Sequence, residues 1–359
     1  MDEPELNDLA AIVPPLLRCL EALGFISRYL NPQDFPALMD ACGTPEVALG
    51  EALPRLGAWP PGLAGPKAAL TNAGLEVLAA FQELRQAPEQ ADGLGAVYRA
   101  LRHVPRAQEA LYLLASGLPP VSRYFLDPPR RDDTALLSRL AQAEPRPDIG
   151  LRHFDNEPGT RGGYSVYVPE TFDPGIPLPL VMALHGGGGH GRGFLWNWLR
   201  DARTYGAILV APTSMGRTWA ISGEDLDTPN LAAILDQVRA GWRVDPDRLL
   251  LAGLSDGGTF AYVSGLETTS PFTHLAPTAA AFHPMLTGFA DPGRIIGLPI
   301  HITHGALDWM FSVTMAREAQ SALSTAGAHV TYREVDDLSH TWPRELNADI
   351  LQWLNAPRG

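Results

Sequence analysis

From residue 149 onward, short apolar runs alternate with segments of helical spacing, and this alternation strongly constrains the fold. Strands are predicted at 162–169, 177–189, 207–212, 248–258, 298–305 and 329–335. Helices are predicted at 228–242, 258–265, 312–326 and 343–354. Continuous apolar strands that alternate with helices indicate an α/β fold, with a mostly parallel sheet covered on both faces.

The first 130 residues follow a different pattern, with apolar residues three or four positions apart over 13–30, 72–86 and 91–116. Pro105 predicts a break or kink, and clusters such as AWPPGLAGP separate the helical stretches. We expect a small all-helical N-terminal domain over 1–130, a linker with a short helical patch over 131–148, and an α/β domain over 149–359. The helical domain shows no catalytic motif, and a cap, a homo-oligomer contact and a partner-binding role all remain open.

The chain is acidic, with 40 Asp and Glu against 27 Lys and Arg and a formal net charge of -13. Such a surface repels phosphates and anionic lipids, so neither nucleic acid nor a membrane is an expected partner. No uninterrupted apolar run approaches the roughly 20 residues that span a bilayer. The N-terminus, MDEPELNDLA, lacks the layout of a signal peptide, and a cytoplasmic location is therefore expected.

Cys19 and Cys42 are the two cysteines of the chain. Their spacing fits no zinc pattern, and two thiols do not make a disulfide framework. We expect reduced, mostly buried thiols with no catalytic role and no metal site.

Residues 253–257, GLSDG, form a G-x-S-x-G motif between a predicted strand and a predicted helix. A turn of this kind holds its serine in a strained conformation with the Oγ exposed. The flanking glycines are needed because a Cβ there would collide with the neighbouring strand and helix. A glycine-rich surface turn is the alternative interpretation. The context favours Ser255 as a nucleophile.

A serine hydroxyl needs a base within hydrogen-bond reach. His340, in LSHTWP, lies in a loop between a late strand and the C-terminal helix, where the histidine of a Ser–acid–His arrangement belongs in chain order. His283, His301 and His304 are the competitors, and the last two lie within or at the end of a predicted strand. We predict that His340 is the base.

The acid that orients this histidine should follow a strand and precede the histidine. Asp308, in HGALDWM, meets both conditions. Asp336 and Asp337 are alternatives close to His340, although a solvated acidic turn explains them as well. Asp256 is assigned no role in proton transfer.

The sequence HGGGG at 185–189 follows another apolar strand. An oxyanion needs two inward-pointing backbone N–H groups, which we assign to Asp256 and Gly187, with Gly188 as the fallback. A phosphate loop and a flexible turn are the other interpretations, and the absence of a following Gly-Lys-Ser/Thr excludes a P-loop. His185 is expected to shape the loop through a side-chain hydrogen bond.

Tryptophans lie in or beside each of these loops. Trp309, Trp342 and Trp219 are the candidate substrate-binding residues, and Trp196 and Trp198 follow the glycine loop. Ordinary packing of loops is an equally good explanation for any one of them.

Together these motifs resemble the carboxylesterase and polyhydroxyalkanoate-depolymerase-like branch of the α/β-hydrolases, which includes feruloyl- and acetylxylan-esterase relatives. The resemblance covers about residues 151–355 and rests on ALHGGGG, APTSMGRTW, VDPDRLLLAGLSDGGTFAY, HITHGALDWM and LSHTWP. The chain departs from the pattern in its helical N-terminal domain and in lacking the secretion signal typical of extracellular depolymerases.

The resemblance implies an α/β-hydrolase fold and a serine carboxylic-ester hydrolase that works through an acyl-enzyme, without metal or organic cofactor. The family's nucleophile, acid, histidine and oxyanion glycine fall on Ser255, Asp308, His340 and Gly187. Small or aryl esters are the expected substrates, with polyesters as further candidates, and the acyl and alcohol groups stay open.

Other functions remain as alternatives. A serine peptidase or amidase uses the same groups, but no paired acidic site for a substrate amine is visible. A thioesterase would favour a basic pocket for a nucleotide carrier, and none is apparent. A non-catalytic binding module would have little reason to keep all three groups in register.

Overall fold

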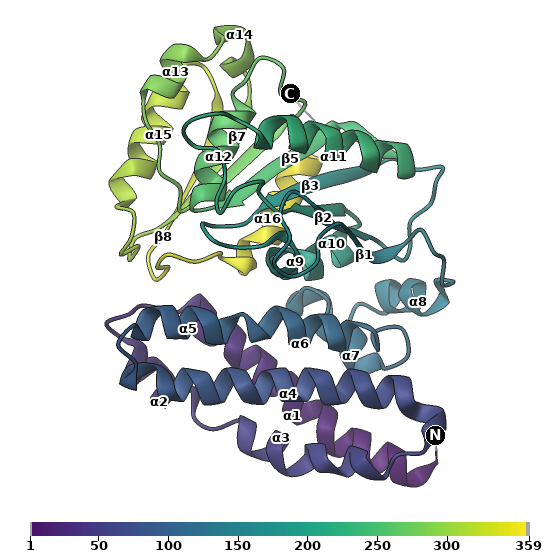
Figure 1. Cartoon of the computed structure of the whole chain (residues 1–359). Helices are drawn as coiled ribbons and strands as arrows, with labels where there is room; N and C mark the ends of the chain where they lie inside the picture. Colours follow the sequence, from purple (N-terminus) through teal and green to yellow (C-terminus); the bar gives the residue numbers. More distant parts are fainter. Residues whose placement is uncertain (1, 357–359) are drawn as a thin grey trace. The chain divides into compact units, whose positions relative to one another are not determined.

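The computed structural model describes residues 2–356, which form two compact units that divide between Leu137 and Ser138. The first unit is helical, as predicted (Figure 1). Its α-helices are α1 (Glu3–Arg28), α2 (Phe35–Cys42), α3 (Glu46–Ala52), α4 (Ala64–Gln86), α5 (Gly93–Leu101), α6 (His103–Tyr112) and α7 (Pro119–Tyr124). Short 3₁₀ turns lie at Leu53–Ala58, Pro61–Leu63, Ala87–Glu89 and Pro128–Arg130. Helix α8 (Thr134–Gln142) matches the helical patch predicted within 131–148.

Helix α1 begins ten residues before the amphipathic stretch noted in the sequence and contains Pro14 and Pro15. Ile12, Leu16 and Leu23 are fully buried, which places one face of α1 in the core of the helical unit. By length and composition α1 could also cross a bilayer, but half of its most apolar window is buried, and core helices pass the same test. The predicted absence of a membrane partner stays a prediction.

Pro105 and the two cysteines of this unit lie in the kinds of position predicted for them. Pro105 lies in the first turn of α6, directly after the break between α5 and α6. Cys19 is buried and Cys42 is half-buried, and both are free thiols. Burial raises the pKa of Cys19 to about 12 and also raises that of Cys42, so little reactive thiolate forms at neutral pH.

The second unit is built on an eight-stranded sheet in the order β1-β2-β4-β3-β5-β6-β7-β8. The pairs β1–β2 and β2–β4 are antiparallel, whereas the strands from β4 to the β8 edge run parallel to one another. The strands are β1 (Gly150–Phe154), β2 (Tyr164–Val168), β3 (Leu178–Leu184), β4 (Ile208–Pro212), β5 (Val244–Leu254), β6 (His274–Thr278), β7 (Pro299–Gly305) and β8 (His329–Val335).

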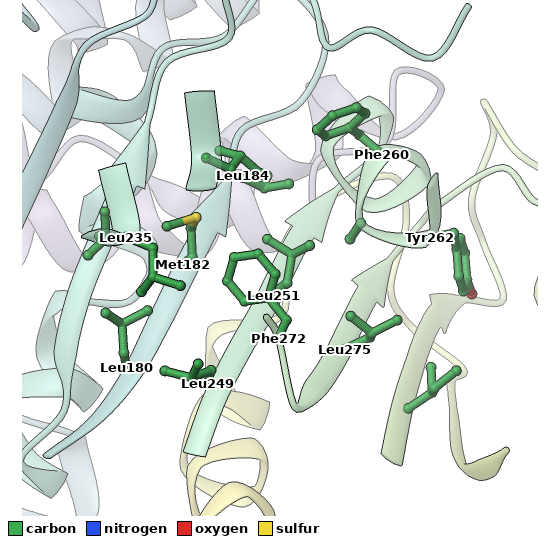
Figure 2. Packing of buried hydrophobic residues seen from close by; sticks show 14 of the residues in the cluster. Leu180, Met182, Leu184, Leu235, Leu249, Leu251, Phe260, Tyr262, Phe272 and Leu275 are labelled. Atoms are coloured by element: carbon green, nitrogen blue, oxygen red, sulfur yellow. The ribbon is translucent and has the colours of Figure 1, made fainter. Parts of the chain in front are cut away.

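Helices cover both faces of this sheet (Figure 1). They are α9 (Gly191–Phe194), α10 (Leu199–Tyr205), α11 (Asp227–Gly241), α12 (Asp256–Gly265), α13 (Met285–Phe289), α14 (Pro292–Ile295), α15 (Val313–Thr325) and α16 (Asn347–Asn355), with 3₁₀ turns at Leu195–Asn197 and Arg344–Leu346. Alternate strand residues serve the two faces, because successive side chains of a strand point in opposite directions. One face packs against α11, α12 and α15 and forms a hydrophobic core with them (Figure 2). The residues of this core labelled in Figure 2 are Leu180, Met182, Leu184, Leu235, Leu249, Leu251, Phe260, Tyr262, Phe272 and Leu275. The intervening residues Val181, Ala183 and Leu250 are equally buried, and α10 and α16 pack against each other and on strands of the sheet.

The predicted fold class, a mostly parallel α/β sheet preceded by a helical region, is confirmed. Each predicted strand is present, with bounds shifted by four residues or fewer apart from the glycine-rich end at 189, where β3 ends five residues earlier. Two strands were not predicted. Strand β1 is only half-buried, and the five residues of β6, HLAPT, include a histidine and a proline. Short runs with so few apolar residues give no period-2 signal.

Candidate active site

The GLSDG turn lies between β5 and α12, with Ser255 as the residue before the helix. Ser255 has φ 55° and ψ −122°, a left-handed conformation that is strained for a residue with a side chain. Its N–H donates to the carbonyl of Thr278 at 2.9 Å, which ties the turn to the end of β6. A Cβ on Gly253 would overlap the Gly257 carbonyl, and a Cβ on Gly257 would lie 2.6 Å from the carbonyl oxygen of Leu184 at the end of β3. The expected need for both glycines is therefore confirmed.

The structure brings Ser255, His340 and Asp308 together. His340 Nε2 lies 3.0 Å from Ser255 Oγ, and His340 Nδ1 lies 2.8 Å from Asp308 Oδ2. Ser255 follows β5, Asp308 follows β7 and His340 follows β8, so all three are at the carboxyl ends of parallel strands. The Asp308 side chain is fully buried and that of His340 is 6% exposed. A proton can therefore pass from Ser255 to His340 without bulk water between them.

Asp308 is held as a carboxylate by a complete set of donors. Its Oδ1 accepts the N–H groups of Met310 and Phe311 at 2.9 and 2.8 Å. Its Oδ2 lies within hydrogen-bond distance of both His340 and His304. Burial by itself raises the pKa of this carboxyl, but the hydrogen bonds from His304, His340 and Phe311 outweigh it and leave the pKa well below its usual range.

The loops that carry the acid and the histidine are joined by their backbones. The N–H of Ala306 donates to Val335 at 2.9 Å, and the N–H of Leu307 donates to Leu338 at 3.0 Å. Gly305 permits this approach, because a Cβ there would overlap the Leu338 carbonyl oxygen. The ring of Phe311 meets His340 edge-on at 5.3 Å between centroids. Backbone pairing and ring packing thus set the position of the imidazole.

Apart from His304, the competing groups lie away from the contacts between Ser255, His340 and Asp308. Asp336 and Asp337 are exposed, as expected of a solvated turn. His301 packs edge-on against Trp353 and lies 3.3 Å from the Thr303 hydroxyl. His283 accepts the N–H of Met285 in the loop after β6.

The glycine loop after β3 passes beside Ser255. A Cβ on Gly186 would lie 3.6 Å from the Cβ of Ser255. His185 Nδ1 donates to the Gly186 carbonyl at 2.7 Å, and its Nε2 accepts the N–H of Ser214 at 3.2 Å. Burial lowers the pKa of His185 to about 3, so it is neutral and its tautomer is set by these two bonds. The prediction that His185 shapes this loop is confirmed.

The proposed oxyanion donors lie on two neighbouring elements. Asp256 is the first residue of α12, and the first N–H groups of a helix have no partner within the helix. A Cβ on Gly187 would lie 2.5 Å from Asp256 Oδ2, so Gly187 is close to the start of this helix. The Asp256 carboxylate accepts the Thr218 hydroxyl at 2.6 Å, which agrees with its having no proton-transfer role. Gly188 has φ 66°, which forms the turn of the loop.

Two charged residues that the sequence did not single out brace the site. Arg161 donates to the Gly189 carbonyl at 2.8 Å and to the carbonyls of Ser214 and Gly216 at 3.0 and 2.8 Å. Asp227 is buried and accepts two backbone N–H groups from the loop after β4, at 2.7 and 2.8 Å. Both residues lie outside the motifs, and no local pattern distinguishes them from ordinary surface charges.

The three candidate substrate-binding tryptophans differ in exposure. Trp219 and Trp342 are buried, and their indole N–H groups donate to the His185 carbonyl at 2.7 Å and to Asn347 at 2.9 Å. These contacts give both side chains structural tasks. Trp309 is 37% exposed and its ring centroid lies 6.2 Å from that of His340, so of the three it is the exposed one and it lies beside His340.

No group of three or more His, Cys, Asp or Glu residues suited to a metal ion occurs within residues 2–356.

The comparison with known families gives a match between residues 227–357 and the family described as Phospholipase/Carboxylesterase. This range contains Ser255, Asp308 and His340, and it leaves out the glycine loop and the helical unit.

Several characterised proteins are similar to part of the chain. A bifunctional acetylxylan esterase/xylanase from Neocallimastix patriciarum is 28% identical over 44% of this chain and 23% of its own length. Feruloyl esterase C from Emericella nidulans is 28% identical, and a probable feruloyl esterase C from Aspergillus niger is 25% identical, each over 38% of this chain and 52% of its own length. The chain thus spans about half or less of the length of these relatives.

Solved structures of esterases are also similar to part of the chain, at low identity. A thermostable esterase is 20% identical with a TM-score of 0.46, and the match covers 58% of this chain and 62% of that protein. Esterase PE8 is 19% identical with a TM-score of 0.42 over 57% of this chain and 100% of that protein.

Proposed function

Because the chain belongs to the α/β-hydrolase family of serine esterases, we propose that it hydrolyses carboxylic esters with Ser255, His340 and Asp308 as the catalytic triad. The observation that carries the proposal is the pair of short contacts at the strand ends, 3.0 Å from Ser255 to His340 and 2.8 Å from His340 to Asp308. The left-handed backbone at Ser255 supports it, because such strain persists only where the surrounding structure enforces it.

The reaction begins when His340 Nε2 removes the Oγ proton as Ser255 attacks the ester carbonyl. Asp308 orients the imidazole and stabilises the imidazolium. Protonated His340 then gives its proton to the leaving alcohol, and an acyl-enzyme forms. A water molecule repeats the sequence on the acyl group, which releases the acid and restores Ser255.

The oxyanion of each tetrahedral intermediate needs donors that are in place before the reaction. We assign these to the backbone N–H groups of Asp256 and Gly187, with Gly188 as the fallback. The position of Gly187 against Asp256 and the packing of Gly186 against Ser255 support this assignment. The start of α12 adds the positive end of a helix dipole at the same point.

Replacement of Ser255 by alanine tests the proposal. Ser255→Ala should reduce kcat on p-nitrophenyl acetate by about 10⁴-fold or more, because the nucleophile is absent. The measurement is kcat/KM together with labelling by a fluorophosphonate probe. Ser264→Ala removes a buried serine from the same helix and should keep both activity and labelling. Retention of most activity by Ser255→Ala would contradict the assignment of Ser255 as the nucleophile.

The substrate that fits best is a neutral ester with an apolar or aryl group. Six exposed large apolar residues of the second unit lie in loops that follow the carboxyl ends of β4 and β7, the edge of the sheet that carries the triad. We call these residues the apolar edge: Met215, Ile221 and Leu226 after β4, and Leu307, Trp309 and Met310 after β7. Exposed apolar groups gathered at one place mark sites for apolar ligands. The net charge of -13 further disfavours anionic substrates.

Polyesters are candidate substrates for the same reason, since a polymer surface is neutral and apolar. A location in the cytoplasm, the absence of nucleic acid and membrane partners, and a homo-oligomer formed through the helical unit stay predictions. Light scattering of the purified chain tests the last of these.

A further inference from the structure

His304 is the second histidine in contact with Asp308, and the proposed mechanism gives it no task. It is the residue before Gly305 at the end of β7 and is fully buried. Its Nε2 lies 3.2 Å from Asp308 Oδ2 and 3.0 Å from the carbonyl oxygen of Phe311. Both atoms near Nε2 are acceptors, so this nitrogen carries the proton; it donates to the Phe311 carbonyl and lies beside the Asp308 carboxylate.

The other ring nitrogen shows that this arrangement has a cost. His304 Nδ1 is buried and has no hydrogen-bond partner within the described residues. A buried polar atom without a partner is unfavourable, and in a native structure each such atom calls for an explanation. An apolar residue of similar size would avoid the cost if the position served packing alone. The donor at Nε2 is what the imidazole supplies there.

We propose that His304 is a positioning residue that sets the charge and orientation of Asp308 for its contact with His340. The inference rests on the proposed function, because it concerns how the acid of the triad acts. His304 touches neither the nucleophile nor the substrate, and it acts through Asp308.

The geometry around Asp308 Oδ2 gives the physical reason. This oxygen receives His340 Nδ1 at 2.8 Å and His304 Nε2 at 3.2 Å, so two imidazoles share one acceptor. The hydrogen bond from His304 helps to keep the carboxyl ionised against burial. It also withdraws charge from the oxygen that faces His340, which weakens the pull of the carboxylate on the imidazolium.

His304 and Asp308 both form hydrogen bonds with the backbone of Phe311. The Phe311 carbonyl accepts from His304 Nε2, and the Phe311 N–H donates to Asp308 Oδ1 at 2.8 Å. The ring of the same Phe311 contacts His340 edge-on. Loss of the His304 donor therefore loosens both Asp308 and the Phe311 ring that packs against His340.

The ionisable groups near His304 pair with one another, and their charges do not change over the pH range of the experiment. Glu334 of β8 lies opposite His304 in the strand register and accepts hydrogen bonds from Arg317 of α15 and from Tyr332. These bonds lower the pKa of Glu334 to about 2, and burial together with Glu334 raises the pKa of Tyr332 to about 12. Neither group titrates between pH 5 and pH 9.

The experiment compares His304→Leu, His304→Asn and His304→Gln in the full chain. Glutamine places an N–H donor near the position of Nε2, whereas leucine has no donor and asparagine is too short to reach. His304→Leu and His304→Asn should lower the plateau kcat/KM on p-nitrophenyl acetate by about tenfold or more. They should also move the acid limb of the pH profile upward by about half a pH unit to one unit. His304→Gln should restore the limb to within about 0.2 units of the wild type.

The pH dependence of fluorophosphonate inactivation gives a second readout that needs no ester substrate, and His301→Gln is the matched control. His301 is also buried in β7 and has no hydrogen bond to Asp308 among the contacts described. If His304→Leu does not fold, the comparison of glutamine with asparagine decides the question. The inference would be overturned if the His304 variants lose stability or plateau kcat/KM while the acid limb of their pH profile is unchanged. It would also be overturned if the acid limb of His304→Gln shifts as much as that of His304→Asn.

The test separates this inference from the proposed function. Loss of activity in Ser255→Ala together with an unshifted limb in the His304 variants rejects the role of His304 alone. Retained activity in Ser255→Ala rejects the proposed function, whatever the His304 variants do.

Discussion

The Asp308 carboxylate carries a negative charge in a fully buried position at the edge of the sheet. Backbone N–H groups at Oδ1 and imidazoles at Oδ2 replace the water that it loses. These donors lower its pKa despite burial, so the folded protein binds a proton at Asp308 less readily than the unfolded chain does. Protein stability and the charge of the triad are therefore linked through one residue.

This linkage predicts how the effect of Asp308→Asn depends on pH. Stabilisation by a carboxylate with a depressed pKa is complete above the unfolded value of about 4 and is lost as the pH falls toward the folded value. The wild type should exceed Asp308→Asn in urea midpoint at pH 7, and the difference should shrink steadily between about pH 5 and pH 3. Activity at pH 7 should fall by about 10³- to 10⁴-fold. An equal difference in midpoint at pH 7 and pH 3 would contradict this account.

At the scale of elements, the triad depends on how closely the ends of β7 and β8 approach. The two strands pair in parallel from Pro299↔His329 to Gly305↔Val335, and their loops continue the pairing through Ala306 and Leu307. Gly305 lies at the point where the acid loop and the histidine loop touch. The 2.8 Å contact between His340 and Asp308 is thus a consequence of backbone spacing.

Gly305→Ala should disturb this spacing directly. The added Cβ would overlap the Leu338 carbonyl oxygen and would lie 2.8 Å from that of Ser339, so the segment before His340 must move. We expect kcat on p-nitrophenyl acetate to fall by about tenfold or more, with a loss of about 1–3 kcal/mol in the free energy of unfolding.

Gly241→Ala is the control for this substitution. Gly241 lies in α11, has no positive φ, and leaves open space within 4 Å of the position that an added methyl group would take. Alanine there should leave activity unchanged and raise stability slightly. Wild-type kinetics in Gly305→Ala would show that the two loops can separate without harm to the site.

At the scale of the whole molecule, polarity divides the surface of the α/β unit. The apolar edge follows strands β4 and β7, whereas Ile176 and Ile296 are exposed apolar residues that precede β3 and β7 at the opposite edge. The loops of the apolar edge start from the same end of the sheet as the loops of Ser255, Asp308 and His340.

Met310→Ser tests whether the apolar edge binds the substrate. Met310 is 47% exposed, so its replacement removes an apolar contact without disturbing the core. We expect kcat/KM for p-nitrophenyl octanoate to fall by about 5- to 30-fold, and that for the acetate by less than about twofold. Ile296→Ser, at a residue that is 66% exposed on the other edge, should change neither. Equal losses on both esters, or an equal effect of the Ile296 control, would argue against the apolar edge as a substrate site.

Much of this arrangement was predictable from the sequence because it is encoded locally. Apolar runs and helical spacing indicate the strands and helices. Chain order places Ser255, Asp308 and His340 after β5, β7 and β8. Strand β6 escaped prediction since its burial comes from neighbours β5 and β7 on both sides, and not from its own composition. Arg161 escaped for a similar reason, because its carbonyl partners come from distant loops.

The sequence by itself determined the fold class, the order of the strands along the chain and the candidates for nucleophile, base and acid, since each depends on residue type and neighbouring residues. Only the tertiary structure decided that Trp219 and Trp342 are buried, that His304 joins His340 beside Asp308, and which apolar residues of the loops after β4 and β7 stay exposed. These features depend on distances between segments far apart in the chain. Such distances follow from strand pairing and packing, and no local pattern of residues encodes them.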